Sequence, residues 1–444
     1  MNARLESECM SDYLFMLENH LSTDQNRVVA EVQAAASVAN FNLFLTGGAM
    51  RDMLGGFQIR DLDFTVEGNA LKLAKTLTAK AGAKVLSLED NRRTMELVFP
   101  AGVTVEIGMA RRERYPKIGG RPQVTPSTIQ DDLHRRDFSV NAIALSLNRA
   151  SRGLLLDPLN GLADLGRKEL RTISPTAFYD DPPRLLRLVR LRHRLGYAVE
   201  EKTQSQYENA RAAKMEAHIP RRVLCEELKH IATEPSPSAV VEALQQDGFL
   251  ALFSEALSGP KLNLAGLAKL EKARRLLPAE SITAASSWGP FLYVLTEKLN
   301  PREKQSLIKQ TEMRKSEVDS WQKLPLRAKK LDAAVRSAKL KKPSQIYDLL
   351  SKAPADEMLF LLYHSPVRLI HDRIKNYLQK YIPLSQEITD AEVEAAGAAP
   401  GTPKFQKLKE EMISARLDGR TKKPPPPPVE PVVMTAAMRG RGVR

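Results

Sequence analysis

The chain has 444 residues, of which 43% are hydrophobic and 27% charged, and its formal net charge is +14 at pH 7. A chain of this length forms roughly two to four compact domains, and its basic excess favours polyanionic partners, nucleic acid first. Two cysteines, Cys9 and Cys225, exclude a disulfide framework and a cysteine zinc site. No run of 18 or more apolar residues occurs, so we expect a cytoplasmic protein without a membrane span.

The first 150 residues combine helices with short strands. Residues 1–40 are predicted as a helical segment, because Ser22 and Thr23 can cap an alanine- and valine-rich stretch without a helix breaker. Residues 41–150 read as mixed α/β, with a helix at 69–82 and a half-exposed sheet. The predicted strands are 42–46, 61–66, 94–99 and 103–109.

The rest of the chain is predicted to be helical. After residue 157 nearly every segment has helical spacing, and "TKKPPPPPVEPVVMTAAMRGRGVR" closes the chain as a proline-rich stretch with a basic end. We therefore expect helices over 151–235 and 236–380, and a largely disordered extension over 381–444. The basic segment 301–343 is predicted as a solvated helical face, with an RNA contact as the alternative.

The stretch "LTGGAMRDMLGGFQIRDLDFTV" carries the first candidate site. A double glycine after a strand lets backbone amides approach a phosphate, and Arg51 follows on the first turn of a helix. Asp61 and Asp63 alternate on the next strand and are expected to share one face. Two carboxylates so close repel each other unless a cation lies between them, and Mg²⁺ suits oxygen ligands and phosphate. Taken alone, the double glycine could be a plain turn, and the D-x-D could be a chance pattern on an exposed strand.

A third acid is expected on a neighbouring strand. The alternation in "VTVEIGM" places Glu106 on the polar face, where it would join the same metal site if the two strands are adjacent. A surface glutamate is the equal alternative. Acids of this kind, holding two metal ions, suit in-line displacement at phosphorus. The chain has no Walker loop, which argues against a P-loop NTPase.

Two arginine-rich segments follow. In "DDLHRRDFSVNAIA", residues 131–144, the charges indicate either a solvated loop or a site for an anion. In "FYDDPPRLLRLVRLRHRLGY", Asp181 and Pro182 have the form of an N-cap and first helical position. A carboxylate and a guanidinium such as Asp181 and Arg184 can together read the Watson–Crick edge of cytosine or adenine. The helix then carries one arginine stripe: Arg184, Arg187, Arg190 and Arg194.

These motifs, in this order, resemble the class II (bacterial-type) tRNA nucleotidyltransferase/poly(A) polymerase family over roughly residues 40–260. "GGAMRD" with "DLDF", "RRDFSVNA", "DPLNGLADL" and "DDPPRLLR" are similar to its catalytic, nucleotide-binding, neck-entry and base-reading motifs. The resemblance implies an α+β protein: a small five-stranded, polymerase beta-like nucleotidyltransferase head at 41–150, a helical neck at 151–235 that reads the base, and a helical, RNA-binding body and tail at 236–380.

The resemblance also implies roles for individual residues. Asp61 and Asp63 would bind Mg²⁺, Glu106 would complete the catalytic acids, and Asp137 would contact the ribose 2′-OH. Asp131, Asp132 and Arg135 are read as loop charge. The implied nucleotide-binding set is Gly47, Gly48, Arg51, Asp52, Arg136, Asp137, Asn141, Asp181, Arg184, Arg187 and Arg190.

The activity implied is addition of CCA, or CC or A alone, to tRNA 3′ ends from CTP and ATP, without a nucleic-acid template. A bacterial poly(A) polymerase is the alternative within the family; "EDNRRTMELVFPAG" lacks the GRRFR-like stretch that such enzymes typically carry. A non-catalytic RNA-binding protein on the same scaffold is the alternative of another class. Pro183 is unusual in the family's base-reading turn; if it shifts the start of the helix, the geometry of Asp181 and Arg184, and base selection with it, would suffer.

Overall fold

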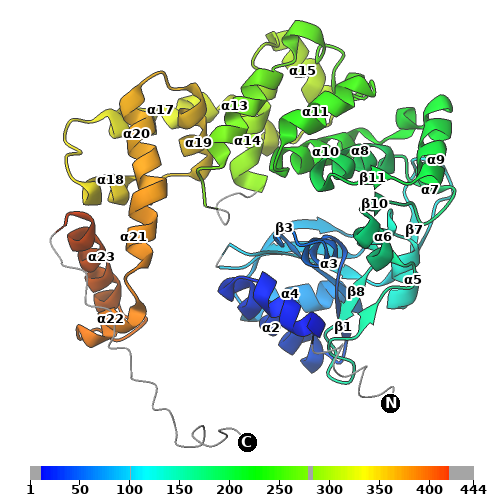
Figure 1. The fold of residues 1–444 in the computed structure, drawn as a ribbon, viewed down its shortest axis with the longest axis horizontal. Coiled ribbons are helices and arrows are strands. Elements are labelled where there is room, and N and C mark those ends of the chain that lie inside the picture. Colours follow the sequence, from blue (N-terminus) through cyan, green and yellow to red (C-terminus); the bar gives the residue numbers. More distant parts are fainter. Residues whose placement is uncertain (1–11, 101, 279–283, 420–444) are drawn as a thin grey trace, which may run out of the picture. The chain divides into compact units, whose positions relative to one another are not determined.

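The computed structural model describes residues 12–100, 102–278 and 284–419. The chain divides into two compact units, Met1–Pro325 and Leu326–Arg444, and the candidate site residues all lie in the first (Figure 1). The proline-rich end of the chain, for which we expected disorder, lies outside the described residues.

A mixed sheet of seven strands forms the first part of this unit. Its strand order is β3-β4-β5-β2-β1-β8-β9, and every neighbouring pair is antiparallel except the parallel pair β2 and β5. The strands are β1 (Asn42–Thr46), β2 (Leu62–Glu67), β3 (Lys84–Glu89), β4 (Thr94–Val98), β5 (Thr104–Met109), β8 (Ala144–Ser146) and β9 (Leu155–Leu156).

The number of strands differs from the five that we expected. The four strands predicted from the sequence are present, and β1 has the predicted bounds, 42–46. Two of the additional strands, β8 and β9, contain only three and two residues, too few to show an alternating pattern. All six residues of the edge strand β3 are exposed, so no buried face distinguished it in the sequence.

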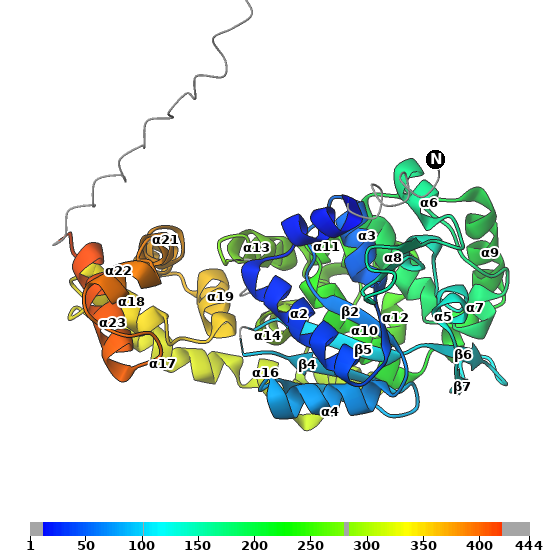
Figure 2. The same ribbon diagram turned by 90° about the horizontal axis from the view of Figure 1, so that it is seen from below.

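Apolar alternation anchors the central strands. In β2, Leu62, Phe64 and Val66 are buried, while Asp63 is only partly covered. Such alternation places the carboxylate on the opposite face from the apolar core. The helices α2 (Thr23–Val38) and α4 (Ala70–Lys80) pack together against the sheet (Figure 2), and α3 (Gly47–Leu54) follows β1 directly.

The remaining elements of the first unit are mainly helical, as predicted. A hairpin of β6 (Arg111–Arg114) and β7 (Gln123–Pro126) precedes them. The elements that follow the hairpin are α5 (Ile129–His134), η1 (Ser139–Asn141), α6 (Gly161–Arg167), β10 (Glu169–Leu170), α7 (Ala177–Asp180), α8 (Arg184–Leu195), β11 (Ala198–Val199), α9 (Glu201–Ala212), η2 (Met215–His218), α10 (Arg221–Thr233), α11 (Pro237–Gln246), α12 (Leu250–Phe253), η3 (Gly259–Lys261), α13 (Leu264–Arg274), α14 (Ala284–Leu295), α15 (Pro301–Gln310) and α16 (Lys315–Gln322).

The second unit is helical throughout its described part, and the expected disorder from residue 381 onward is wrong for 382–417. The apolar residues of this stretch pack into a core that includes Ile388, Val393, Phe405 and Leu417. The elements are α17 (Leu324–Arg336), whose first turn crosses the division, α18 (Pro343–Leu350), α19 (Ala355–His364), α20 (Arg368–Asn376), the π-helix η5 (Tyr377–Tyr381), α21 (Ile382–Gln386), α22 (Asp390–Ala395) and α23 (Pro403–Leu417).

Candidate active site

Three carboxylates lie in one row across the middle of the sheet. Asp63 of β2 pairs directly with Glu106 of β5, and Glu106 pairs with Glu96 of β4. Directly paired residues project from the same face, with Cβ atoms roughly 5 Å apart. Asp61 lies in the bend just before β2, not on the strand as we expected. The predicted proximity of Glu106 to Asp63 follows from this register.

The start of helix α3 contacts this row. The backbone N–H of Gly48 donates to Asp63 Oδ2 over 2.9 Å. Gly47 has φ +64°, and a Cβ there would approach both Asp63 Oδ2 and Arg136 Nη1 to 3.0 Å. Only glycine tolerates that backbone conformation and that closeness without strain. The double glycine therefore brings backbone, carboxylate and guanidinium together at one point.

The protein balances the charge at Asp63 only in part, through Arg136 and the Gly48 N–H. Burial, with the neighbouring Glu106 and Asp61 adding to it, raises the pKa of Asp63 to about 7. A divalent cation among these oxygens would relieve that repulsion, so the donor set fits Mg²⁺. Within the described ranges, no group of three or more Asp, Glu, His or Cys is arranged to hold a metal ion alone. Water or substrate oxygens would have to complete the coordination.

Arg136 is held beside the row by a buried carboxylate. Asp132, which is fully buried, accepts from Arg135 at Oδ1 (2.6 Å) and from Arg136 at Oδ2 (3.0 Å). Arg136 also donates to the Thr65 hydroxyl over 3.1 Å and to the Asn141 carbonyl over 3.2 Å. Our interpretation of Asp132 and Arg135 as loop charge is wrong, because Asp132 is buried and pairs with both Arg135 and Arg136.

A chain of hydrogen bonds links α3 to the neck. Arg51 donates to its neighbour Asp52 and, over 2.7 Å, to the side-chain oxygen of Asn141. Asn141 in turn donates to Asp137 over 2.9 Å, and Arg187 of α8 donates to the other Asp137 oxygen over 2.8 Å. Five of the predicted site residues thus lie in one connected network.

The predicted base-reading pair is also together. Arg184 Nε donates to Asp181 Oδ2 over 3.3 Å, and Arg184 Nη2 donates to the Arg135 carbonyl over 2.8 Å. Helix α8 begins at Arg184 rather than at Pro182, so Asp181 is not its N-cap. The helix starts directly after Pro183, and the carboxylate and the guanidinium remain in contact, so the base-reading geometry is kept.

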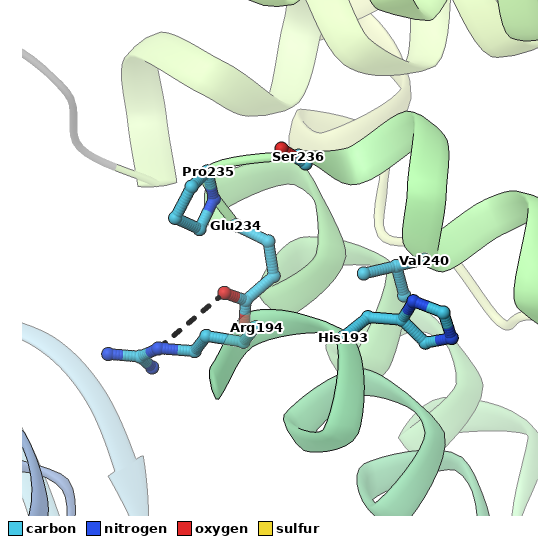
Figure 3. Close-up of a pocket in the computed structure, with 6 residues that line it drawn as sticks. All are labelled: His193, Arg194, Glu234, Pro235, Ser236 and Val240. Carbon is cyan, nitrogen blue, oxygen red and sulfur yellow. Dashed lines mark ion pairs between the residues drawn. The ribbon is translucent and has the colours of Figure 1, made fainter. Parts of the chain in front are cut away.

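The arginine stripe of α8 divides into two halves. Arg184 and Arg187 contact residues of the 131–144 segment, as described above. Arg190 is buried between Glu227 (2.6 Å) and Glu234 (2.9 Å). Arg194 donates to Asp52 and lies 3.7 Å from Glu234 in a small pocket of about 60 Å³ (Figure 3). The second half is thus bound to protein carboxylates.

Sequence reasoning missed three acidic residues around the site: Glu96, Asp132 and Glu234. Glu96 alternates with the apolar residues of "TMELVF", so the same reasoning that selected Glu106 could have found it. Asp132 lies three and four residues before Arg135 and Arg136, a spacing that favours ion pairs at the end of a helix. No sequence signal indicated Glu234, because its partners are distant in the chain.

Comparison with known proteins shows what part of the chain is similar to a known family. The family model for the poly(A) polymerase head domain matches residues 43–171. An A-adding tRNA nucleotidyltransferase of Halalkalibacterium halodurans is 41% identical over 194 residues, 44% of this chain and 45% of that protein. A CC-adding tRNA nucleotidyltransferase of Deinococcus radiodurans is 36% identical over 202 residues, 46% of this chain and 53% of that protein.

The chain is similar to the class II tRNA nucleotidyltransferase/poly(A) polymerase family, and the family model for the head domain covers its residues 43–171. It spans about half the length of the curated relatives it matches. A solved CCA-adding enzyme in an apo form has the same fold, with a TM-score of 0.51 at 22% identity over 92% of this chain and 95% of that chain. A mixed-sheet head followed by helices, as predicted, is therefore confirmed. Among the described residues, no helix is long and apolar enough to cross a membrane.

Proposed function

We propose that this protein transfers nucleotides from CTP or ATP to the 3′ end of tRNA, adding CCA or part of it and releasing pyrophosphate. One observation carries the proposal. The carbonyl of Arg135 holds Arg184 of the base-reading pair, and the next residue, Arg136, lies beside Gly47 and Asp63. A single dipeptide therefore joins a group suited to reading a base to a group suited to phosphoryl chemistry.

Asp61 and Asp63 are proposed to hold Mg²⁺, with Glu106 as the third acid beside them. The ion, when bound, lowers the pKa of an attacking hydroxyl and stabilises charge on the leaving pyrophosphate. Asp63 is oriented for this by the Gly48 N–H. Asp61, in the bend before β2, is free of the strand's pairing and can adjust to the ion.

The nucleotide is proposed to lie between the start of α3 and helix α8. Gly47 and Gly48 offer backbone N–H groups to phosphate oxygens, and Arg136 offers a guanidinium at the same point. Four further residues would support the site indirectly, by holding other residues in place through the hydrogen bonds described above: Arg51, Asp52, Asn141 and Arg190. Arg187, which is half-exposed, would reach phosphate, and Asp137 would accept from the ribose 2′-OH.

Base choice is proposed to rest on Asp181 and Arg184. Asp181 would accept from the 4-amine of cytosine or the 6-amine of adenine, and Arg184 would donate to the adjacent ring nitrogen or carbonyl. Uracil and guanine present a carbonyl where those amines lie, which a carboxylate repels. The contact of Arg184 with the Arg135 carbonyl restricts its side chain to one orientation, which favours selectivity over adaptability.

Nucleotide incorporation tests the proposal directly. Purified protein with Mg²⁺ would receive tRNA transcripts ending at the discriminator base, at C or at CC, with each NTP singly and then together. Products that stop at CCA, at CC, or at A on the CC-ended RNA would support the proposal and define its branch. Long A tails on any 3′ end would instead establish a poly(A) polymerase.

A substitution separates catalysis from RNA binding. Asp61→Ala should abolish addition while tRNA binding survives, since the basic helices after residue 236 would carry most of the affinity. An electrophoretic mobility shift with the same transcripts measures the second property. Wild-type protein that binds tRNA but adds nothing would indicate a non-catalytic RNA-binding protein. Activity on tRNA also implies a cytoplasmic location, which we include in the proposal.

A further inference from the structure

A buried carboxylate lies where α10 ends. The Glu234 side chain is 1% exposed, and three guanidinium groups surround it. Arg190 Nη1 is 2.9 Å from Oε1, and Arg60 Nη2 is 3.8 Å from Oε2. Arg194 Nε is 3.7 Å from Oε2 (Figure 3). These arginines come from α8 and from the loop before β2. Glu234 thus contacts arginines from two separate parts of the first unit.

One of these arginines adjoins the candidate metal site. Arg60 immediately precedes Asp61, and its Nη1 donates to the Thr233 carbonyl over 2.9 Å. The bend that carries Asp61 has no strand pairing of its own. The contacts of Arg60 with Thr233 and Glu234 are therefore the side-chain interactions that tie this bend to α10.

A second arginine leads to helix α3. Arg194 contacts Glu234 and also donates to Asp52, which is buried on α3. Helix α3 starts with Gly47 and Gly48, the residues that touch Asp63. Through Arg60 and Arg194, Glu234 is connected to both segments that flank the carboxylate row.

The opposite side of Glu234 is fixed to another helix. Arg274 of α13 donates to the Ala232 carbonyl over 2.6 Å and to the Glu234 carbonyl. The backbone around Glu234 is therefore held independently of its side chain. A change limited to the carboxylate should leave this attachment in place.

We propose that Glu234 is a positioning residue that sets the placement of Asp61 and of the start of α3 through Arg60 and Arg194. This inference rests on the proposed function only for its catalytic consequence. Its physical basis is charge: the buried carboxylate lies between three arginines, of which Arg190 also pairs with Glu227 and Arg194 with Asp52. Loss of the carboxylate would leave the cluster with more positive charge, and its arginines would repel one another. The arginines would then separate, and Asp61 and Asp52 would move with them.

Glu234→Gln is the principal test variant, since it keeps the shape and removes the charge. Hydrogen exchange of the protein without nucleotide should become faster in residues 55–61 and in α3, but not in α4. Manganese binding, measured by calorimetry, should weaken about tenfold. Glu234→Asp should restore part of both effects, and Glu242→Gln, on the exposed face of α11, should change neither.

Steady-state nucleotide addition gives the catalytic readout. Glu234→Gln should lower kcat about tenfold or more and also raise KM for the nucleotide, because both Asp61 and the start of α3, where the phosphates are proposed to bind, are displaced. Equal loss of stability in all segments, without selective exchange at 55–61, would show a purely structural role and overturn the inference. If wild-type protein adds no nucleotide but the exchange result holds, the proposed function fails and the positioning role stands.

A second variant covers the case in which Glu234→Gln does not fold. Arg60→Gln removes one partially exposed member of the cluster and leaves Arg190 paired with Glu227 and Glu234. It should accelerate exchange in residues 55–61 and weaken manganese binding, while α3 remains protected because Arg194 still contacts Asp52. Unchanged exchange at 55–61 in this variant would also overturn the inference.

Discussion

Two groups of carboxylates differ in the direction in which the protein shifts their pKa. The first is the carboxylate row on the sheet, and the second is the arginine network, the buried acids that pair with arginines. In the row, burial together with the neighbouring acids Glu106 and Asp61 raises the pKa of Asp63. In the network, burial works against the charged form, yet the arginines paired with Asp132, Asp137 and Glu227 hold the pKa of each below its usual range.

This difference separates what the protein completes by itself from what it leaves for a ligand. The acids of the network are ionised and paired, so they stabilise the fold and orient their partners. The acids of the row repel one another until a cation arrives. Substitutions in the row should therefore affect catalysis far more than folding, whereas substitutions of the paired acids in the network should also lower the stability of the fold.

The largest effect is expected for Asp63→Asn. Removing one metal ligand forfeits several kcal/mol of transition-state stabilisation, which corresponds to a loss of about 10³-fold in kcat. Stability should not fall, because a repulsive charge is removed and an oxygen remains for the Gly48 N–H. Nucleotide incorporation and thermal unfolding measure the two properties. Asp24→Asn, on the exposed side of α2, is the control; a marked drop in the melting temperature of Asp63→Asn would contradict the comparison.

Asp132→Asn should produce the opposite pattern. It leaves Arg135 and Arg136 without their buried counter-charge, and breaking a buried ion pair costs about 3–5 kcal/mol. Unfolding in denaturant measures this loss. The neighbouring Asp131→Asn provides a matched control, because Asp131 pairs with the exposed Arg112 and its loss should change stability little. Equal effects of the two substitutions would show that burial of Asp132 has no energetic role.

Asp181→Asn tests base choice. Asp181 pairs with Arg184, which the network holds through the Arg135 carbonyl. The amide can donate to a carbonyl, so UTP and GTP should gain relative to CTP and ATP. Discrimination worth about 1–3 kcal/mol per bidentate contact corresponds to roughly a 5- to 150-fold change in the ratio of kcat/KM values. Competition assays with paired nucleotides measure it. An unchanged ratio would mean that Asp181 does not contact the base.

The smallest effect concerns pH. Burial opposes the charge on Glu113, but Arg135, Arg111 and Arg92 lower its pKa to about 2. The folded protein therefore binds this proton less readily than the unfolded chain, whose glutamate titrates near 4.5. The stabilisation is complete above that value and declines as pH falls toward 2, by about 1 kcal/mol between pH 7 and pH 4. The difference in unfolding free energy between wild type and Glu113→Gln should shrink by that amount, whereas a constant difference would contradict the assigned shift.

Local patterns in the sequence predicted much of the head and of the carboxylate row. The strand at 42–46 follows from its apolar residues and the glycines after it, and alternation identified Glu106. The network could not be read in the same way, because its pairs lie far apart in the chain: Arg194 and Asp52 are separated by 142 positions, and Arg60 and Thr233 by 173. Such contacts depend on how helices pack, which spacing along one helix does not reveal.

Two errors have more local causes. The expected boundary of disorder was placed at residue 381, too early in the chain, because of the proline-rich end. The capping box of Thr389 and Glu392 marks the start of α22 and could have corrected that boundary. The edge strand β3 has no buried face, so its strand character depends on pairing with β4 alone.

The dipeptide Arg135–Arg136 has an evolutionary consequence. Adjacent Cα atoms are separated by about 3.8 Å, and that separation does not vary. A change in nucleotide preference can arise at Asp181 or Arg184, but an insertion between residues 135 and 136 would pull the selecting arginine away from the reaction centre. Lineages of this protein are therefore expected to alter which nucleotide they use by exchanging side chains around a peptide whose length is preserved.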